Sequence, residues 1–204
     1  MSDVEICNVA LTELGEETLV SLDDNIKNAR LCKLHYPRAR DELQASYRWN
    51  FCLRRVDLGA PLTEKPVYGF GNRFQLPPDV LRVWDTDQDF CQWRIEDDEL
   101  ITDANPIKIL YSSRVEDTGS FSMGFRRTLE LMIAARIAFP ITRQPEITQL
   151  MEARMQVVLE DARTYESQEN STEVLGPGSD LIVLDRFGGV GPGEFFPNIT
   201  ITSE

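Results

Sequence analysis

The segment FRRTLELMIAARIAF, residues 125–139, is apolar on nearly every face that a helix would present. A helix without a polar side must be surrounded by other elements, so this segment predicts the most buried helix of the chain. We expect Pro140 to end it, because the residue before a proline avoids helical backbone. Pro145 suits the first position of a further helix that runs to about residue 167.

Two earlier segments also have helical periodicity. Residues 4–14 place one apolar stripe along a short helix, and Ser2 with Glu5 has the spacing of a capping box. Residues 25–50 carry a longer amphipathic stripe. Pro37 lies inside that stripe, and the hydrogen bond that a proline removes predicts a kink there rather than a complete break.

Residues 67–114 have a different texture. Short apolar runs alternate with polar residues and are separated by proline and glycine, which is the pattern of antiparallel strands. Asp97 and Asp98 lie between two such runs and predict a hairpin turn. The predicted fold class is therefore α+β, mainly α. It comprises an antiparallel helical bundle (residues 1–56 and 116–168), an inserted small antiparallel β-domain (57–115) and an extended C-terminal arm (169–204).

Charge is distributed unevenly along the chain. The net charge is −13, which disfavours a DNA-binding surface, yet residues 27–55 carry eight basic and two acidic side chains. This basic segment suits association between identical copies, because arginine and aromatic residues are enriched at interface centres. A solvated basic face, with Asp41 and Glu42 pairing locally, is the alternative. The candidate interface residues are Arg38, Arg40, Tyr47, Arg48, Trp49, Arg54 and Arg55.

Carboxylates are concentrated between residues 85 and 103. The segment Asp85–Phe90 begins like a calcium-binding loop, but Phe90 occupies the glycine position, so we predict no metal site. Two carboxylates on a hairpin could also form a glycosidase pair, although a solvated acidic face is the simpler interpretation. The candidate acidic lumen or nozzle face consists of Asp85, Asp87, Asp89, Asp97, Asp98 and Glu99.

The last 28 residues are rich in glycine and proline and also contain apolar clusters. Such a segment is too apolar for a simple solvated linker and too rich in glycine to fold alone, so it predicts binding to a partner, for example by strand addition. The candidate binding residues of this arm are Leu181, Ile182, Val183, Leu184, Phe195, Phe196, Ile199 and Ile201.

The sequence lacks the common motifs of catalysis and cofactor binding. The sequence contains no nucleophile-elbow, phosphate-loop or zinc-protease motif, and its one histidine, His35, fits a structural role. We therefore predict a protein that is not an enzyme and needs no cofactor. The start of the chain does not resemble a signal peptide, and no apolar run is long enough to span a membrane. Free, buried thiols are expected at Cys7, Cys32, Cys52 and Cys91.

Five motifs occur in one order along residues 5–165: CNVALTELGEETLVSLDD, ARLCKLHYPRARDEL, RWNF, FQLPPDVLRV and LMIAARIAFPIT. Together they resemble the tail tubular protein A family, the head-to-tail adaptors, or gatekeepers, of short-tailed bacteriophages. The segment after Gly176 is similar to that family only in being extended.

The resemblance implies a location in the virion, with host cytoplasm during assembly. It implies a ring, typically of twelve copies, between the portal protein and the tail nozzle formed by tail tubular protein B. The helical part would form the ring wall, the β part would face the nozzle and the arm would clasp the portal. Such a ring completes the DNA channel, retains the packaged genome and passes it during ejection.

DNA would be a passing duplex, which an acidic lumen would repel rather than hold through counterion release. Two other functions remain open from the sequence. One is a tail-associated polysaccharide-degrading hydrolase that uses a carboxylate pair, an activity proposed for some family members. The other is a monomeric module that binds a peptide or small ligand.

Overall fold

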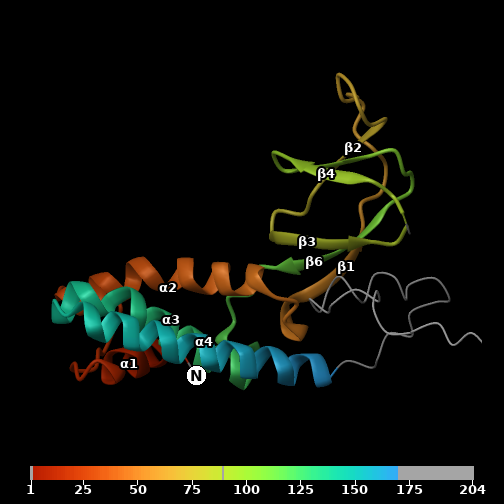
Figure 1. The fold of residues 1–204 in the computed structure, drawn as a ribbon. Helices are drawn as coiled ribbons and strands as arrows, with labels where there is room; N and C mark the ends of the chain where they lie inside the picture. The colour runs from red at the N-terminus through yellow and green to blue at the C-terminus, as the bar shows by residue number, and fades with distance from the viewer. Residues whose placement is uncertain (1, 89, 170–204) are drawn as a thin grey trace, which may run out of the picture. The chain divides into compact units, whose positions relative to one another are not determined.

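The structure, a computed structural model, describes residues 2–88 and 90–169. These form a mixed α+β fold of four α-helices and two small antiparallel sheets (Figure 1). Asp89 and all eight candidate residues of the arm lie outside the described residues. The helices are α1 (Asp3–Glu13), α2 (Lys27–Ser46), α3 (Met123–Thr142) and α4 (Pro145–Gln168), and the strands are β1 (Leu53–Asp57), β2 (Asn72–Gln75), β3 (Val80–Thr86), β4 (Trp93–Glu96), β5 (Glu99–Thr102) and β6 (Lys108–Ser113).

The start of α1 and the end of α2 are set by local hydrogen bonds. The predicted capping box is confirmed: the Glu5 amide donates to Ser2 Oγ, and the Ser2 amide donates to the Glu5 carboxylate. Helix α2 continues through Pro37 without a break and ends at Ser46, earlier than predicted. Its end is fixed by the Trp49 indole, whose Nε1 donates to the Leu43 carbonyl at 2.7 Å.

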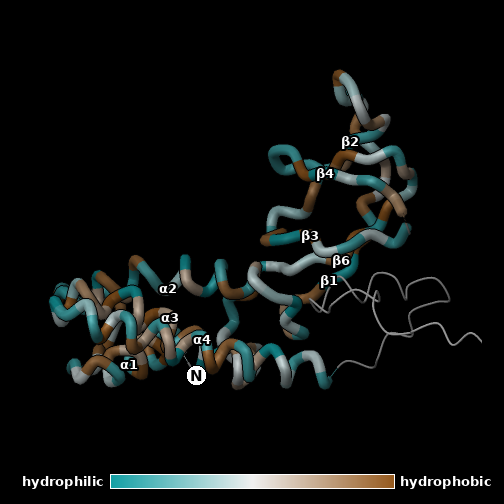
Figure 2. Tube along the Cα trace, viewed as in Figure 1, coloured by the Kyte–Doolittle hydropathy of each residue, from teal (hydrophilic) through white to brown (hydrophobic). Residues whose placement is uncertain are grey.

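Helix α3 is the most buried of the described helices, as its all-round apolar sequence predicts. It packs against α1, α2 and α4, and Figure 2 shows hydrophobic positions gathered among these helices while the outer turns of α2 are hydrophilic. The prediction that Pro140 ends α3 is wrong, because the helix continues to Thr142. A proline this close to the end removes only one bond, and the helix stops where Arg143 adopts a left-handed backbone, with φ of 61°.

The β part consists of two sheets, whereas the sequence predicted one. The strand orders are β1-β6-β3 and β2-β5-β4, and all pairs are antiparallel. Strand β1 begins at Leu53, so the β part starts before the predicted boundary at residue 57. The two sheets share one buried cluster, to which Val83, Ile109 and Tyr111 contribute from the first sheet and Phe74 and Leu100 from the second.

A separate core joins the helices. Its centre is aromatic, with the ring of Phe125 lying 5.1 Å from Trp49, 4.8 Å from Phe51 and 4.9 Å from Phe121, centroid to centroid. Within residues 2–88 and 90–169, no helix combines the length and the apolar character that crossing a membrane requires.

Candidate interaction surface

The structure divides the seven candidate interface residues by burial. Trp49 is fully buried and Arg40 is 7% exposed, so neither can meet another molecule, and both are corrected to core residues. Arg40 instead pairs with Asp41 at 2.8 Å and Glu116 at 3.3 Å. Tyr47 is half-buried, and its hydroxyl donates to the Arg163 carbonyl of α4 at 3.2 Å. Sequence composition could not separate these buried side chains from exposed ones.

The other four candidates reach the surface. Arg38 is exposed on α2, and Arg54 is exposed on β1, where it pairs with Asp79 at 3.5 Å. Arg48 is half-buried and Arg55 is exposed. Only Arg48 and Arg55 of the seven lie on the surface described next.

The outer face of the β1-β6-β3 sheet carries cationic and aromatic side chains. Leu53 and Arg82 both pair with Ser112 of β6, so these residues and Arg55, two positions after Leu53, point to the same side. The side chains of the opposite side, such as Tyr111, enter the β core. Trp84 belongs to the outer side because its Nε1 donates to Ser112 Oγ at 2.7 Å.

We call Arg48, Arg55, Arg82 and Trp84 the cationic face. The Arg82 guanidinium lies 4.1 Å from the centroid of the Trp84 ring, and the Arg48 guanidinium lies 5.6 Å from it. Arg82 also donates to the Ala45 carbonyl at 3.3 Å, which joins the end of α2 to β3. Each cation–π contact of this exposed kind contributes roughly 0.5–1 kcal/mol, so these contacts favour the observed arrangement of the two guanidinium groups around the Trp84 ring.

The arginines of the cationic face have no ion-pair partner within residues 2–88 and 90–169. Among the residues that the structure describes, Arg48, Arg55 and Arg82 form no ion pair, whereas Arg54 does. Sequence reasoning missed Arg82 and Trp84. Their signal was the spacing of two residues in VLRVWDT, which places both on one side of a strand.

A complementary acidic surface lies on α4. Glu152 and Glu160 are exposed and eight residues apart, so they lie within about 80° of each other around the helix. Asp161 is also exposed, but it lies nine residues from Glu152 and about 180° around the helix from it. In the described part of the chain these three carboxylates form no ion pair. The sequence analysis considered the apolar side of this helix and did not identify these three carboxylates.

The candidate acidic residues of the β part fall into two places. The predicted turn is confirmed, with Asp97 and Asp98 joining β4 to β5 and Asp97 in left-handed backbone. Asp85 and Asp87 lie elsewhere, at the end of β3, and Asp87 accepts a bond from the Lys108 amide at 2.8 Å. Within the described ranges no group of three or more His, Cys, Asp or Glu side chains could hold a metal ion.

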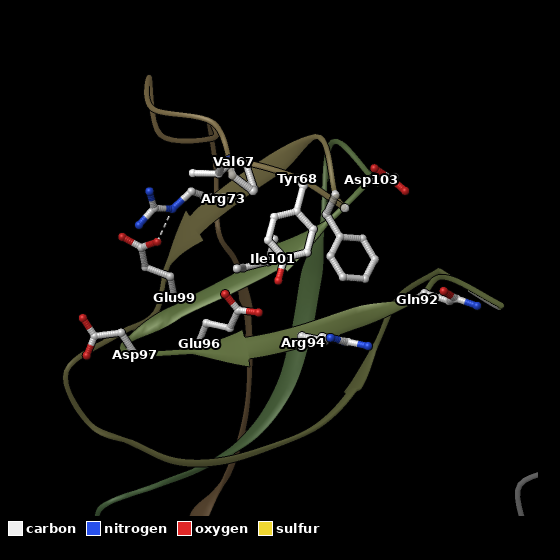
Figure 3. A pocket seen from close by; sticks show the side chains of 13 residues that line it. Val67, Tyr68, Arg73, Gln92, Arg94, Glu96, Asp97, Glu99, Ile101 and Asp103 are labelled. Atoms are coloured by element: carbon white, nitrogen blue, oxygen red, sulfur yellow. Dashed lines mark hydrogen bonds and ion pairs between the residues drawn. The ribbon is translucent and has the colours of Figure 1, made fainter.

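A hollow of about 630 Å³ lies over the β2-β5-β4 sheet (Figure 3). Tyr68 and Val67 come from the loop before β2, and Ile101 lies on the sheet beneath. Two of its four carboxylates have structural partners: Glu99 accepts from Arg73, and Asp103 accepts from the Gly71 amide at 2.7 Å. The other two carboxylates that line the hollow, Glu96 and Asp97, are exposed.

The buried titratable groups also have structural environments. Burial, with Arg136 and Arg38 nearby, lowers the pKa of His35, which keeps the ring neutral at physiological pH. Cys7, Cys32 and Cys52 are buried as predicted, whereas Cys91 is half-buried. The contact with Cys32 and burial raise the pKa of the Cys7 thiol well above its usual range, which favours the protonated thiol.

No protein-family model matches this sequence, and a search of curated proteins finds no significant match.

Proposed function

We propose that this chain is a structural adaptor of a phage virion. It forms a ring between the portal and the tail nozzle, completes the DNA channel, retains the packaged genome and passes it during ejection. The observation that carries the proposal is the pair of unlike surfaces on one chain: a cationic face whose arginines form no ion pair with the described residues, and the exposed carboxylates of Glu152 and Glu160 on α4. The order of the five motifs that resemble tail tubular protein A supports the same function.

A ring requires two different surfaces that fit each other. Identical copies that join head to tail use a heterologous contact, and a closed ring forms when the rotation between copies closes. In the proposed contact, the cationic face of one copy meets Glu152 and Glu160 of the next. Arginine and tryptophan at the centre of the contact supply hot-spot side chains, and the charges set its register.

The remaining parts follow from the resemblance. The helical bundle of residues 1–56 and 116–168 forms the ring wall, and the β part faces the nozzle. The exposed Asp97 and Asp98 turn presents negative charge there, which repels DNA phosphate within a Debye length of about 8 Å and keeps the duplex mobile. The arm after residue 169 clasps the portal. Twelve copies are the number that the resemblance implies.

Mixing the full-length chain with purified portal rings and imaging the particles tests the proposal. The expected result is an additional ring of density attached to the portal. Replacing Arg55 and Arg82 together by glutamate should abolish that ring, because both surfaces then repel each other. Replacing Glu152 and Glu160 by lysine in the same chain should restore it.

The control for charge alone is Arg94→Glu, which changes an exposed arginine of β4 outside the cationic face and should leave the ring intact. Portal rings that stay bare with the wild-type chain contradict the adaptor function. A ring that survives the double arginine change, with the control also intact, removes the cationic face from the contact while leaving the function standing.

A further inference from the structure

The side of α4 that faces away from α3 carries an apolar strip. Leu150 is 55% exposed and Val157 is 61% exposed, and the two residues lie seven positions apart on the same side of the helix. Ala153 lies between them, is also exposed, and is small enough to let another helix approach closely. Three neighbouring apolar side chains on one solvent-facing side of a helix form a surface on which a further element can pack.

Two opposite charges accompany this strip, one before Val157 along the helix and one after it. Arg154 is 41% exposed, although its Nη1 donates to Glu13 at 2.7 Å. Asp161 is exposed and forms no ion pair with the residues that the structure describes. Arg154 and Asp161 lie within about 20° of each other around α4, but two turns, or about 10 Å, separate them along it. The helix therefore places the two charges on one side without pairing them.

We propose that this side of α4 is a contact surface for a second copy of the chain, with the two α4 helices antiparallel and Val157 of each copy at the two-fold axis. In such an isologous contact, a residue that meets another across the axis is met by it in return. Arg154 lies three residues before Val157 and Asp161 four residues after it, so a copy that runs in the opposite direction brings Arg154 of one chain to Asp161 of the other, twice. Both residues are displaced from Val157 in the same direction around the helix, by about 60° and about 40°, so each pair forms on one flank of the strip.

The same arrangement covers the apolar strip. Val157 meets its own counterpart at the axis, and Leu150 meets Thr164 of the second copy, because both are seven residues from Val157. The contact extends over about 21 Å of helix, which places it among small and transient interfaces. We expect a dissociation constant of the order of 100 µM.

The order of charges along α4 favours a second copy over a partner of one charge. Arg154 and the neighbouring Arg127, which is 42% exposed, would repel a wholly basic segment. Asp161 and the exposed Glu160 would repel a wholly acidic one. An antiparallel copy avoids both penalties, because it presents an acid where this copy presents an arginine.

In the ring proposed above, Glu160 meets the cationic face of a neighbouring copy. Glu160 lies about 60° from Val157 around α4, so a paired copy would crowd it. Pairs would then have to separate before the ring forms, which would limit ring formation in the absence of the portal. That role rests on the proposed function, whereas the pairing is a property of the free chain and is tested without the portal.

Disulfide trapping in the full-length chain tests the pairing. The background is Cys91→Ser, because the other three cysteines are buried. Val157→Cys should then form an interchain disulfide under mild oxidation, since facing Cα atoms of helices about 8–10 Å apart come within the range of about 4–7 Å that a disulfide spans. The matched control is Gln156→Cys, the preceding residue, which is also exposed but points about 100° away around α4. The Val157→Cys chain should form covalent dimers several-fold faster on a non-reducing gel, and equal rates overturn the proposal.

Sedimentation equilibrium supplies a second test that needs no new cysteine. The wild-type chain should show a monomer–dimer equilibrium, and Asp161→Lys should raise its dissociation constant about ten-fold, because Arg154 then meets a lysine at both pairs. The matched control is Glu152→Lys, which makes the same charge change at an exposed position about 180° around α4 from Asp161 and should leave the equilibrium unchanged. Both variants should unfold at the wild-type temperature, since both side chains are exposed.

Three results would overturn the pairing. One is a wild-type chain that stays monomeric from about 10 µM to about 1 mM, a range on both sides of the expected dissociation constant. Another is a dimer that Asp161→Lys leaves intact, and the third is a dimer that Glu152→Lys weakens equally. Each of these results leaves the adaptor function standing, because that function is judged by ring formation on the portal.

Discussion

Helices α3 and α4 approach each other closely at Gly124, and enlarging that residue gives a quantitative test of the fold. A Cβ atom built on Gly124 would lie 2.8 Å from Ala162 Cβ and 3.1 Å from Ala162 Cα. Carbon atoms in favourable contact are about 3.5–4.0 Å apart, so the two helices would have to separate by several tenths of an ångström. The obstructing atoms belong to backbone and Cβ and cannot rotate away.

The cost of Gly124→Ala follows from two opposing effects. Overpacking a tight core contact costs about 1–3 kcal/mol. Alanine favours a helix over glycine by up to about 1 kcal/mol, which offsets part of that cost. The net loss of unfolding free energy should be about 1–2 kcal/mol, and the thermal midpoint should fall by about 2–8 °C for a chain of this size. Circular dichroism at the helical minimum measures both, and a midpoint that is unchanged or higher would refute the close packing of α3 on α4.

The reciprocal change separates steric overlap from any other effect of the alanine. Ala162→Gly alone should cost about 1 kcal/mol, because it places a glycine inside α4. The double variant gains a Cβ atom on α3 and loses the one on α4 that it would overlap. Its loss of unfolding free energy should therefore be smaller than the sum of the losses in the two single variants. Simple additivity would show that the two residues do not interact.

Two further changes test the helical core and the arm. Burial raises the pKa of Glu130 despite the opposing effect of Arg127, so the stability that this carboxyl contributes is present below its usual pKa and is lost as pH rises through its folded-state pKa. The unfolding free energy of Glu130→Gln, measured in urea relative to that of the wild type, should therefore rise as the pH is raised from about 4 to about 7. A difference that stays constant or falls with pH would contradict this. Deleting residues 177–204 should leave a chain that still folds cooperatively, because both described cores precede residue 170. The shortened chain should no longer join portal rings. Normal attachment of the shortened chain would exclude a role of the arm.

The helices of this fold could be predicted from sequence because their signals are local. An all-round apolar segment identified α3 as the buried helix, the Ser2 and Glu5 pair marked the start of α1, and Pro145 marked the start of α4. The end of α3 could not be predicted in the same way. Proline weakens a helix at its own position, but the stop depended on Arg143 reaching a left-handed backbone, a conformation that arginine does not signal.

The candidate surface could be predicted only in part, because its residues come from distant segments. The basic character of residues 27–55 drew attention to Arg48 and Arg55, whose role in an interface stays a prediction. It could not reveal that Trp49 turns inward to bond the end of α2. Nor could it show that Arg82 and Trp84, some thirty residues further along, complete the face, since strand pairing and not sequence distance sets which side chains are neighbours.

In the part of the chain that the structure describes, the arginines of the cationic face form no ion pair, although the full sequence has a net charge of −13, and several nearby acids pair with other basic residues. Asp41 pairs with Arg114 as well as Arg40, Glu42 pairs with Arg136, and Asp79 pairs with Arg54. These three acids close to the basic segment are thus engaged with other basic residues. An exposed ion pair contributes at most about 1 kcal/mol, so neutralising the cationic face internally would add little stability to a single copy. In the proposed ring, the same weak pairs would be repeated at every contact and would act together, so the arrangement is one that would favour assembly between copies over the stability of a single copy.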